Sequence, residues 1–325
     1  MVRYLVRRIL WAALLFIVIT FVTFVIFFIA PNDAARAACG GDSAKPQCIA
    51  LVTAKYGLKK PVYVQYYKFL NRLVVHQSLG TAFATGQNIN DAIKSAASVT
   101  ASLVFGDAVL WVLIGLSVGI FSALKPRSLL DRFAMVFVLI GVSAHPVWIG
   151  LIFSYLFGVK WHITPIANYA NFFGAPPGSG EPGGPWQWFY HLILPWFTFA
   201  LLFAALYVRM IRANVMETLN EDFVRTARAK GLSERRVILR HGVRVSITPV
   251  VTLFGIDLGY LLGGAIIVEN VFNLQGVGQL AVNSLFTNDF PAVMGVTVLA
   301  SLFIVVANLV VDVLYAFLDP RVRYA

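Results

Sequence analysis

The sequence predicts an all-α polytopic membrane protein with six transmembrane helices. Of its 325 residues, 59% are hydrophobic and only 13% are charged, whereas an average soluble domain has about a quarter charged residues. Six apolar stretches approach or exceed the roughly 20 residues that a helix needs to cross a bilayer. The net charge of +11 is interpreted as an orientation signal for these helices, so nucleic acid is not expected as a partner.

The six expected spans follow the apolar stretches in chain order. They lie at 9–30, 99–124, 133–158, 189–208, 247–268 and 293–317. The first stretch carries no charge and is longer than the apolar region of a signal peptide, which has about 7 to 15 residues. It is therefore expected to remain in the protein as the first helix.

One membrane domain with three parts is expected. Residues 1–30 form the N-terminus and the first helix, and residues 31–98 form a small extracytoplasmic segment. Residues 99–325 form a five-helix core, which contains a loop at 214–246.

The distribution of basic residues orients the chain. Six spans place both termini on one side of the membrane, and cytoplasmic loops carry an excess of Lys and Arg. With cytoplasmic termini, 17 of the 26 Lys and Arg residues are inside, and the two short outer loops hold only Lys160. The other eight lie in 31–98, which is longer than the loops that this rule covers. Both termini and the loop 214–246 are therefore predicted to be cytoplasmic.

The outer segment contains both cysteines of the chain, Cys39 and Cys48. They are close in sequence and lie on the oxidising side of the membrane, where disulfides persist. A disulfide is expected, with two free thiols as the alternative. A metal site is not expected, because two cysteines without a nearby histidine supply only half of a usual ligand set.

The loop contains a pattern typical of two short helices joined by a glycine turn. Asn220 is expected to cap a helix over Glu221–Lys230, and Gly231 to end it in a left-handed conformation. Ser233 is expected to cap a second helix, which continues until Pro249 disturbs its hydrogen bonds.

Two alternatives for this unit remain open. A DNA-binding helix-turn-helix has a similar turn, but too few residues separate Gly231 from the apolar stretch at 247 to form a third helix. A solvated basic loop would satisfy the orientation rule, but it would leave Phe223, Ala227 and Leu232 exposed without a partner.

The segment "DFVRTARAKGLSERRVILRH" resembles the cytoplasmic loop of ATP-binding-cassette importer permeases, in which an E-A-A-x-x-x-G pattern forms the coupling helix that docks on the ATPase. Here Arg225, Thr226 and Ala227 stand at the E-A-A positions and Gly231 at the glycine, a departure similar to that of the peptide and nickel branch. Arg244 stands where many sugar permeases have proline. The resemblance implies these ATPase-coupling residues: Glu221, Phe223, Arg225, Thr226, Ala227, Arg228, Lys230 and Gly231.

Further stretches extend the resemblance over most of the chain. "MVRYLVRRIL", "YGLKKPVYVQYYKFL", "LGTAFATGQNI", "DLGYLLGGAIIVENVF" and "LDPRVRYA" resemble the B-type permease of dipeptide and oligopeptide importers. Gln275, where proline is usual, and Asn288, where arginine is usual, depart from the family pattern.

The resemblance implies the type I importer permease fold and translocation of peptides across the cytoplasmic (inner) membrane by alternating access. It implies a second permease in a heterodimer, two cytoplasmic ATPases that bind ATP and magnesium, and an extracytoplasmic substrate-binding protein. The chain itself is then expected to have no cofactor and no enzymatic activity. The alternatives are a permease for nickel or another small solute and, in a different class, a proton-driven secondary transporter.

Three aspartates fall in or near the expected spans, where a charge is costly and a functional role is the first hypothesis. Asp257 is expected to lie deepest and is the candidate for the translocation path, with a structural partner as the alternative. Asp107 is expected near the interface, and Asp312 is expected to pair with Arg321 or Arg323.

No catalytic motif is present in the sequence. The five histidines are scattered, and H-E-x-x-H, G-x-S-x-G and the phosphate-loop pattern are absent. An intramembrane enzyme is therefore the weaker class. His145 precedes Pro146 and is expected to mark a helix bend.

Overall fold

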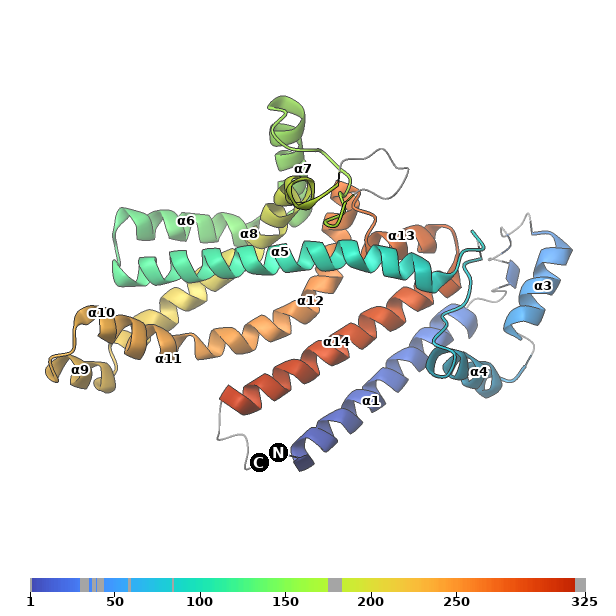
Figure 1. Cartoon of the computed structure of the whole chain (residues 1–325), viewed down its shortest axis with the longest axis horizontal. Helices are drawn as coiled ribbons and strands as arrows, with labels where there is room; N and C mark the ends of the chain where they lie inside the picture. Colours follow the sequence, from blue (N-terminus) through green and yellow to red (C-terminus); the bar gives the residue numbers. More distant parts are fainter. Residues whose placement is uncertain are drawn as a thin grey trace. The chain divides into compact units, whose positions relative to one another are not determined.

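The computed structural model describes residues 2–29, 35–36, 39, 44–57, 60–83, 85–174 and 183–318. This part of the chain is largely helical, and its only β-pairing is an isolated bridge between Thr81 and Asn88. The chain divides into two compact units (Figure 1). The first comprises Met1–Thr100 and Gln275–Val313, and the second comprises Ala101–Leu274 and Leu314–Ala325.

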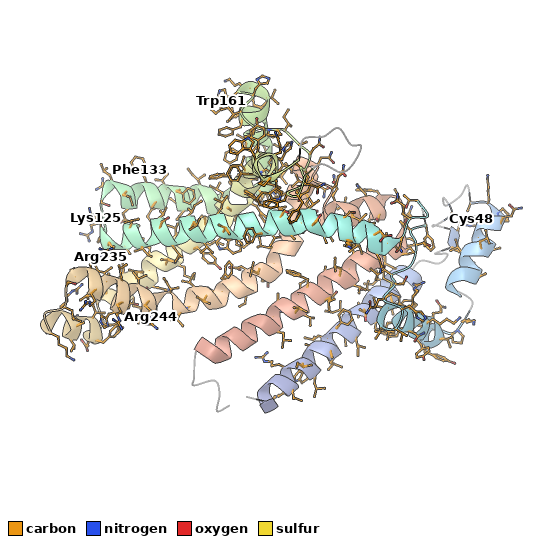
Figure 2. The ribbon with its side chains drawn as sticks, viewed as in Figure 1. Cys48, Lys125, Phe133, Trp161, Arg235 and Arg244 are labelled. Atoms are coloured by element: carbon orange, nitrogen blue, oxygen red, sulfur yellow. A yellow bond between two sulfur atoms is a disulfide. The ribbon has the colours of Figure 1, made fainter. Side chains whose placement is uncertain are left out.

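The first unit contains the N-terminal and C-terminal membrane helices and the outer segment. Its helices are α1 (Val2–Phe24) with the π-helix Val25–Ile29, α3 (Pro46–Tyr56), α4 (Val62–Val74), the start of α5 (Ile89–Leu124), α13 (Val277–Phe286) and most of α14 (Phe290–Leu318). Cys39 and Cys48 are joined by a disulfide, and Cys48 lies in α3 (Figure 2).

Two apolar clusters hold the first unit together. The first turns of α5 pack on α13 and α14 through Ile89, Ile93, Ala96, Val277, Ala292 and Val296. At the end of this contact, the backbone N–H of Val277 donates a hydrogen bond of 2.8 Å to Thr100 Oγ1. The second cluster joins α1, α4 and α14 through Phe24, Phe69, Met294 and Val298.

The second unit contains the remaining helices. They are α5 from Ala101 onward, α6 (Leu129–Ser143), α7 (Pro146–Phe153) with the π-helix Ser154–Lys160, α8 (Pro185–Leu219), α9 (Asp222–Ala229), α10 (Glu234–Arg236), the π-helix Val237–Val243, α11 (Arg244–Ser246) and α12 (Thr248–Phe272).

Glycines allow α5 and α6 to approach α8 closely. A Cβ atom on Gly115 of α5 would lie 2.7 Å from the Cβ of Tyr207, and one on Gly141 of α6 would lie 2.6 Å from the Cβ of Ala205. Both distances are shorter than any contact between two non-bonded carbons. Any larger residue at either position would therefore push the helices apart.

Five helices of the described chain are long and apolar enough to cross a membrane. They are Val6–Phe27, Ile89–Leu124, Pro185–Leu219, Glu234–Leu261 and Phe290–Leu309. The pair Leu129–Ser143 and Pro146–Lys160 makes a sixth span if the two are counted as one, although they are bent by 107°. The predicted fold class is confirmed, but the third span is not the single helix expected over 133–158.

The bend in the third span lies where the sequence indicated it. Ala144 leaves the helical conformation, with φ −90° and ψ 131°, and His145 is extended, with φ −77° and ψ 136°. A residue before proline is disfavoured in the helical region. The Nδ1 of His145 then accepts a hydrogen bond of 3.3 Å from the backbone N–H of Val147 and caps α7.

Candidate functional site: the basic hairpin and the polar groups behind it

The basic hairpin, which we define as residues 221–246, begins directly after α8. Its first helix is α9, with Glu221 at the N-cap, and its second begins after Ser233 at the N-cap of α10. The expectation that Asn220 caps the first helix is wrong. Asn220 ends α8 instead, and its Nδ2 donates a hydrogen bond of 2.9 Å to the carbonyl of Met216.

The turn of the hairpin has the conformation predicted at Gly231. Its φ is +75°, and no atom lies within 4 Å of the position that a Cβ would occupy. The requirement for glycine is therefore conformational, because left-handed backbone is cheap for glycine and costly for a β-branched residue. The N–H of Gly231 donates to the carbonyl of Arg228 at 2.9 Å and closes the turn.

The hairpin has its own small apolar core. Val224, Ala227 and Val237 are buried together, with Leu219 and Leu232 packed against them. Ala227, which the resemblance places among the ATPase-coupling residues, is only 6% exposed and belongs to this core, and its coupling role stays a prediction. Val224 and Ala227 are three residues apart and share the inner face of α9.

The outer face of α9 is amphipathic. Phe223 is 43% exposed, and Arg225, Thr226, Arg228 and Lys230 are exposed around it. Among the residues expected to contact an ATPase, these, Glu221 and Gly231 lie on the surface of the hairpin. The surface available to a partner therefore has Phe223 as its large apolar side chain.

An ion pair joins the two helices of the hairpin across the glycine turn. Arg228 Nη2 lies 2.9 Å from Glu234 Oε1, and Arg228 Nε lies 3.2 Å from Glu234 Oε2. The hydrogen bond with Glu234 raises the pKa of the Arg228 guanidinium above its ordinary value. Because both side chains are exposed to solvent, we expect this pair to orient the turn more than to stabilise it.

The hairpin folds back onto the end of α8. A Cβ atom on Gly242 would lie 2.8 Å from Leu219 Cδ2, and Leu219 also packs on the hairpin core. Asn214 Nδ2 donates a hydrogen bond of 3.5 Å to the carbonyl of Ser246. The last two turns of α8 and the hairpin therefore form one packed body.

Asp257, the candidate for a translocation path, has a partner within this chain. Its Oδ2 accepts a hydrogen bond of 2.6 Å from the hydroxyl of Tyr207 on α8. The Tyr207 ring lies 5.7 Å from that of Trp111, which also contacts Phe254 of α12 at 5.4 Å. Asp257 is thus held at an aromatic contact between α5, α8 and α12, and its role in translocation stays a prediction.

Asp107 lies inside the protein, and its expected place near the membrane interface stays a prediction. It is fully buried, and neither carboxylate oxygen has a hydrogen-bond partner among the described residues. Because α5 begins at Ile89, Asp107 lies near the middle of this helix. Asp312 lies in α14, but its side chain and Arg321 and Arg323 are outside the described residues, so the expected pairing stays a prediction.

Sequence reasoning missed a second polar cluster, which is centred on Asp131 at the start of α6. Arg212 of α8 binds both its oxygens, with Nε–Oδ1 at 2.7 Å and Nη2–Oδ2 at 3.0 Å. Ser122 Oγ donates to Oδ1, and the backbone N–H of Arg127 donates to Oδ2 at 2.8 Å. The Ser128–Asp131 spacing is a local capping signal, but nothing local indicates Arg212, which is 81 residues away.

The described residues contain no group of three or more His, Cys, Asp or Glu side chains that could hold a metal ion. The polar clusters around Asp131 and Asp257 are built from single carboxylates and their donors.

Apolar helices of membrane-spanning length and a basic helix-turn-helix hairpin after α8 define a multi-span membrane protein. The chain belongs to the family of binding-protein-dependent transport system inner membrane components, whose model matches residues 115–324. The model of the N-terminal part of such membrane components matches residues 1–104. These matches confirm the importer permease fold that the sequence resemblance implied.

Relatives align with this chain over its full length. It is 34% identical over 324 residues to the glutathione transport system permease protein GsiC of Escherichia coli K12, with 100% of both chains covered. It is 34% identical, with the same coverage, to GsiC of Salmonella typhimurium LT2. It is 33% identical over 325 residues to the oligopeptide transport system permease protein AppB of Bacillus subtilis 168, again with 100% of both chains covered.

Proposed function

We propose that this chain is a permease subunit of an ATP-driven importer that moves peptides across the cytoplasmic (inner) membrane. The observation that carries the proposal is full-length similarity to permeases named for glutathione and for oligopeptides. Glutathione is itself a small peptide, so both names indicate the same substrate class. A nickel permease and a proton-driven secondary transporter are not favoured by these relatives.

The partners follow from the family. A second permease would complete the pore as a heterodimer, an extracytoplasmic binding protein would deliver the peptide, and two ATPases would bind ATP and magnesium. In this arrangement the chain translocates substrate and leaves ATP hydrolysis to its partners.

The basic hairpin is the proposed docking element for one ATPase. A short helix can occupy a partner's groove when one face offers an apolar side chain with polar residues around it, and Phe223 on α9 is such a residue. Lys125, Arg235 and Arg244 lie toward the same end of the second unit (Figure 2), which supports a cytoplasmic position for that end. Both termini would then also be cytoplasmic.

The proposed transport cycle is alternating access. ATP binding would draw the two ATPases together and move each docked hairpin. Because the hairpin packs on Leu219 at the end of α8, α8 would move with it. Tilting of α8 would open the pore toward the binding protein.

Transport by the reconstituted complex tests the proposal. The chain would be co-produced with its partner permease and two ATPases, placed in vesicles that contain ATP, and supplied with binding protein and radiolabelled glutathione or tripeptide. Uptake should require ATP and should survive an uncoupler that collapses the proton gradient. Uptake driven by a proton gradient without ATP would contradict the proposal.

A further inference from the structure

The Asp131 cluster first fixes the connection between α5 and α6. Arg127 has a left-handed backbone, with φ +64°, a conformation that costs a non-glycine residue about 1 kcal/mol or more. Its N–H is held by Asp131 Oδ2 at 2.8 Å, and Ser122 at the end of α5 donates to Asp131 Oδ1. Asp131 therefore ties the end of α5, the turn and the start of α6 together.

The same carboxylate then joins this turn to α8. Arg212 and Asp131 form a bidentate, side-on ion pair, in which two hydrogen bonds join the guanidinium to the carboxylate. This geometry fixes the relative orientation of the two groups as well as their distance. The Asp131 side chain is 6% exposed and that of Arg212 is 25% exposed. With donors from Ser122 and Arg127 as well, the buried carboxylate is fully satisfied, which is the condition under which such a pair is retained.

Arg212 also lies close to the basic hairpin along α8. It is two turns before Leu219, the residue that packs into the hairpin core and against Gly242. On the other side of the ion pair, α6 packs along α8 through Ala134, Val138 and Val208. A continuous series of packed contacts therefore runs from the hairpin through α8 to Asp131 and into α6.

We propose that Asp131 and Arg212 form the link through which a displacement of the basic hairpin is passed from α8 to α6 and the α5–α6 turn. The inference rests on the proposed function, since the displacement is the one that the ATPases would impose. Apolar contacts alone let packed helices slide by small shear movements. A side-on ion pair at the hairpin end of the helices resists such sliding and makes α8 move with its neighbours. Asp131 and Arg212 are thus positioning residues that act through the helices and do not touch the peptide.

The test measures peptide imported per ATP hydrolysed in the reconstituted four-subunit complex, with radiolabelled tripeptide. Asp131→Asn and Arg212→Gln should each lower this ratio by about tenfold, a loss in the range measured for coupling residues. ATP hydrolysis and the amount of ATPase that copurifies should stay near the wild-type values. The double variant Asp131→Asn/Arg212→Gln should lose no more than either single variant, because both remove the same link.

The controls separate loss of the link from loss of charge or of folding. Arg209→Gln removes an exposed arginine one turn away on α8, and Arg132→Gln removes the exposed neighbour of Asp131 on α6; both should keep the wild-type ratio. Arg212→Lys keeps the charge but cannot form the side-on pair, so it should assemble and still lower the ratio.

Three outcomes would overturn the inference. They are an unchanged ratio in Asp131→Asn and Arg212→Gln, losses that add in the double variant, or loss of ATPase copurification in parallel with uptake in every variant, Arg212→Lys included. A wild-type complex that imports no peptide with ATP would instead contradict the proposed function.

Discussion

At the scale of single residues, the structure separates side chains that fold the hairpin from those that a partner can reach. Ala227 and Phe223 are both apolar residues of α9, but Ala227 is buried and Phe223 is 43% exposed. The sequence pattern marks both positions without distinguishing them, because an eight-residue helix has too few turns to define which face points inward. The contact of Ala227 with Val237, from the second helix of the hairpin, determines which face of α9 is buried.

Gly231→Val should weaken coupling through the backbone of the turn. Valine in the left-handed conformation costs about 1 to 2 kcal/mol, and the turn can relieve this strain only by moving α9. We expect the variant to insert in the membrane but to retain less ATPase or to import less peptide per ATP in reconstituted vesicles. Gly231→Asn is the matched control, because this chain already has asparagine at φ +49° in Asn273 and φ +53° in Asn288. Wild-type coupling in Gly231→Val would show that the turn is not required.

Asp257→Asn tests whether this carboxylate acts in translocation. The amide oxygen can still accept the hydrogen bond from Tyr207, so folding should be nearly unchanged while the charge is lost. We expect peptide uptake to fall several-fold, with wild-type thermal unfolding and ATPase retention. Tyr207→Phe is the complementary control, since it removes the hydrogen bond and keeps the charge. If Asp257→Asn imports peptide at the wild-type rate at every concentration, Asp257 has only a structural role.

At the scale of helices, the sequence predicts which segments cross the membrane but not where the helices end. Residues 89–98 are polar enough to fall outside the second apolar stretch, yet α5 begins at Ile89. It continues outward because Ile89, Ile93 and Ala96 share one face that packs on α13 and α14. The length of an apolar stretch indicates how much of a helix can lie in lipid. The first turns of α5 are instead stabilised by contacts with helices that are distant in sequence.

The candidate site was predictable to the extent that its signals are local. The left-handed turn at Gly231 and the bend before Pro146 follow from single residues and their neighbours. The Asp131–Arg212 pair does not, because α6 and α8 must first pack at Gly141 before these side chains can meet. For the same reason, the burial of Asp107 and the partner of Asp257 could not be inferred from spacing.

The burial of Ala227 leads to a prediction for α9 as an element. Ala227→Glu would place a carboxylate among Val224 and Val237 and should unfold the hairpin, because an unpaired buried charge costs several kcal/mol. Ala229→Glu puts the same side chain on an exposed position of the same helix and should leave the hairpin folded. Limited proteolysis in membranes should therefore cut the hairpin in Ala227→Glu and spare it in Ala229→Glu.

Phe223→Ala completes this comparison. Since Phe223 is exposed, its loss should leave the hairpin resistant to protease and yet reduce the ATPase that copurifies. Full ATPase retention in Phe223→Ala would mean that the docking surface lies elsewhere on the hairpin.

At the scale of the whole molecule, the proposed orientation places the disulfide and the hairpin on opposite sides of the membrane. The distribution of Lys and Arg puts residues 31–98 outside and 214–246 inside. The division of the chain into residues 1–30, residues 31–98 and a five-helix core over 99–325, which contains the loop 214–246, stays a prediction. One labelling experiment can test the orientation, because Cys39 and Cys48 are the only cysteines of the chain and are paired.

Labelling with a membrane-impermeant maleimide should depend separately on reduction of the disulfide and on the side of the membrane on which each cysteine lies. In intact cells or right-side-out vesicles, wild-type protein should remain unlabelled until the disulfide is reduced with a mild reductant, and should then take up two labels at Cys39 and Cys48. Adding Lys230→Cys, an exposed position of the hairpin, to a Cys39→Ser/Cys48→Ser chain should give labelling only after the membrane is opened. The same double-serine chain should keep its ATPases, since the bridge closes a short loop within the first unit and contributes only about 2 to 3 kcal/mol to that segment. Labelling of Lys230→Cys in sealed vesicles would contradict the proposed orientation and the docking role of the hairpin. Labelling of the native cysteines without reductant would show that they are free thiols.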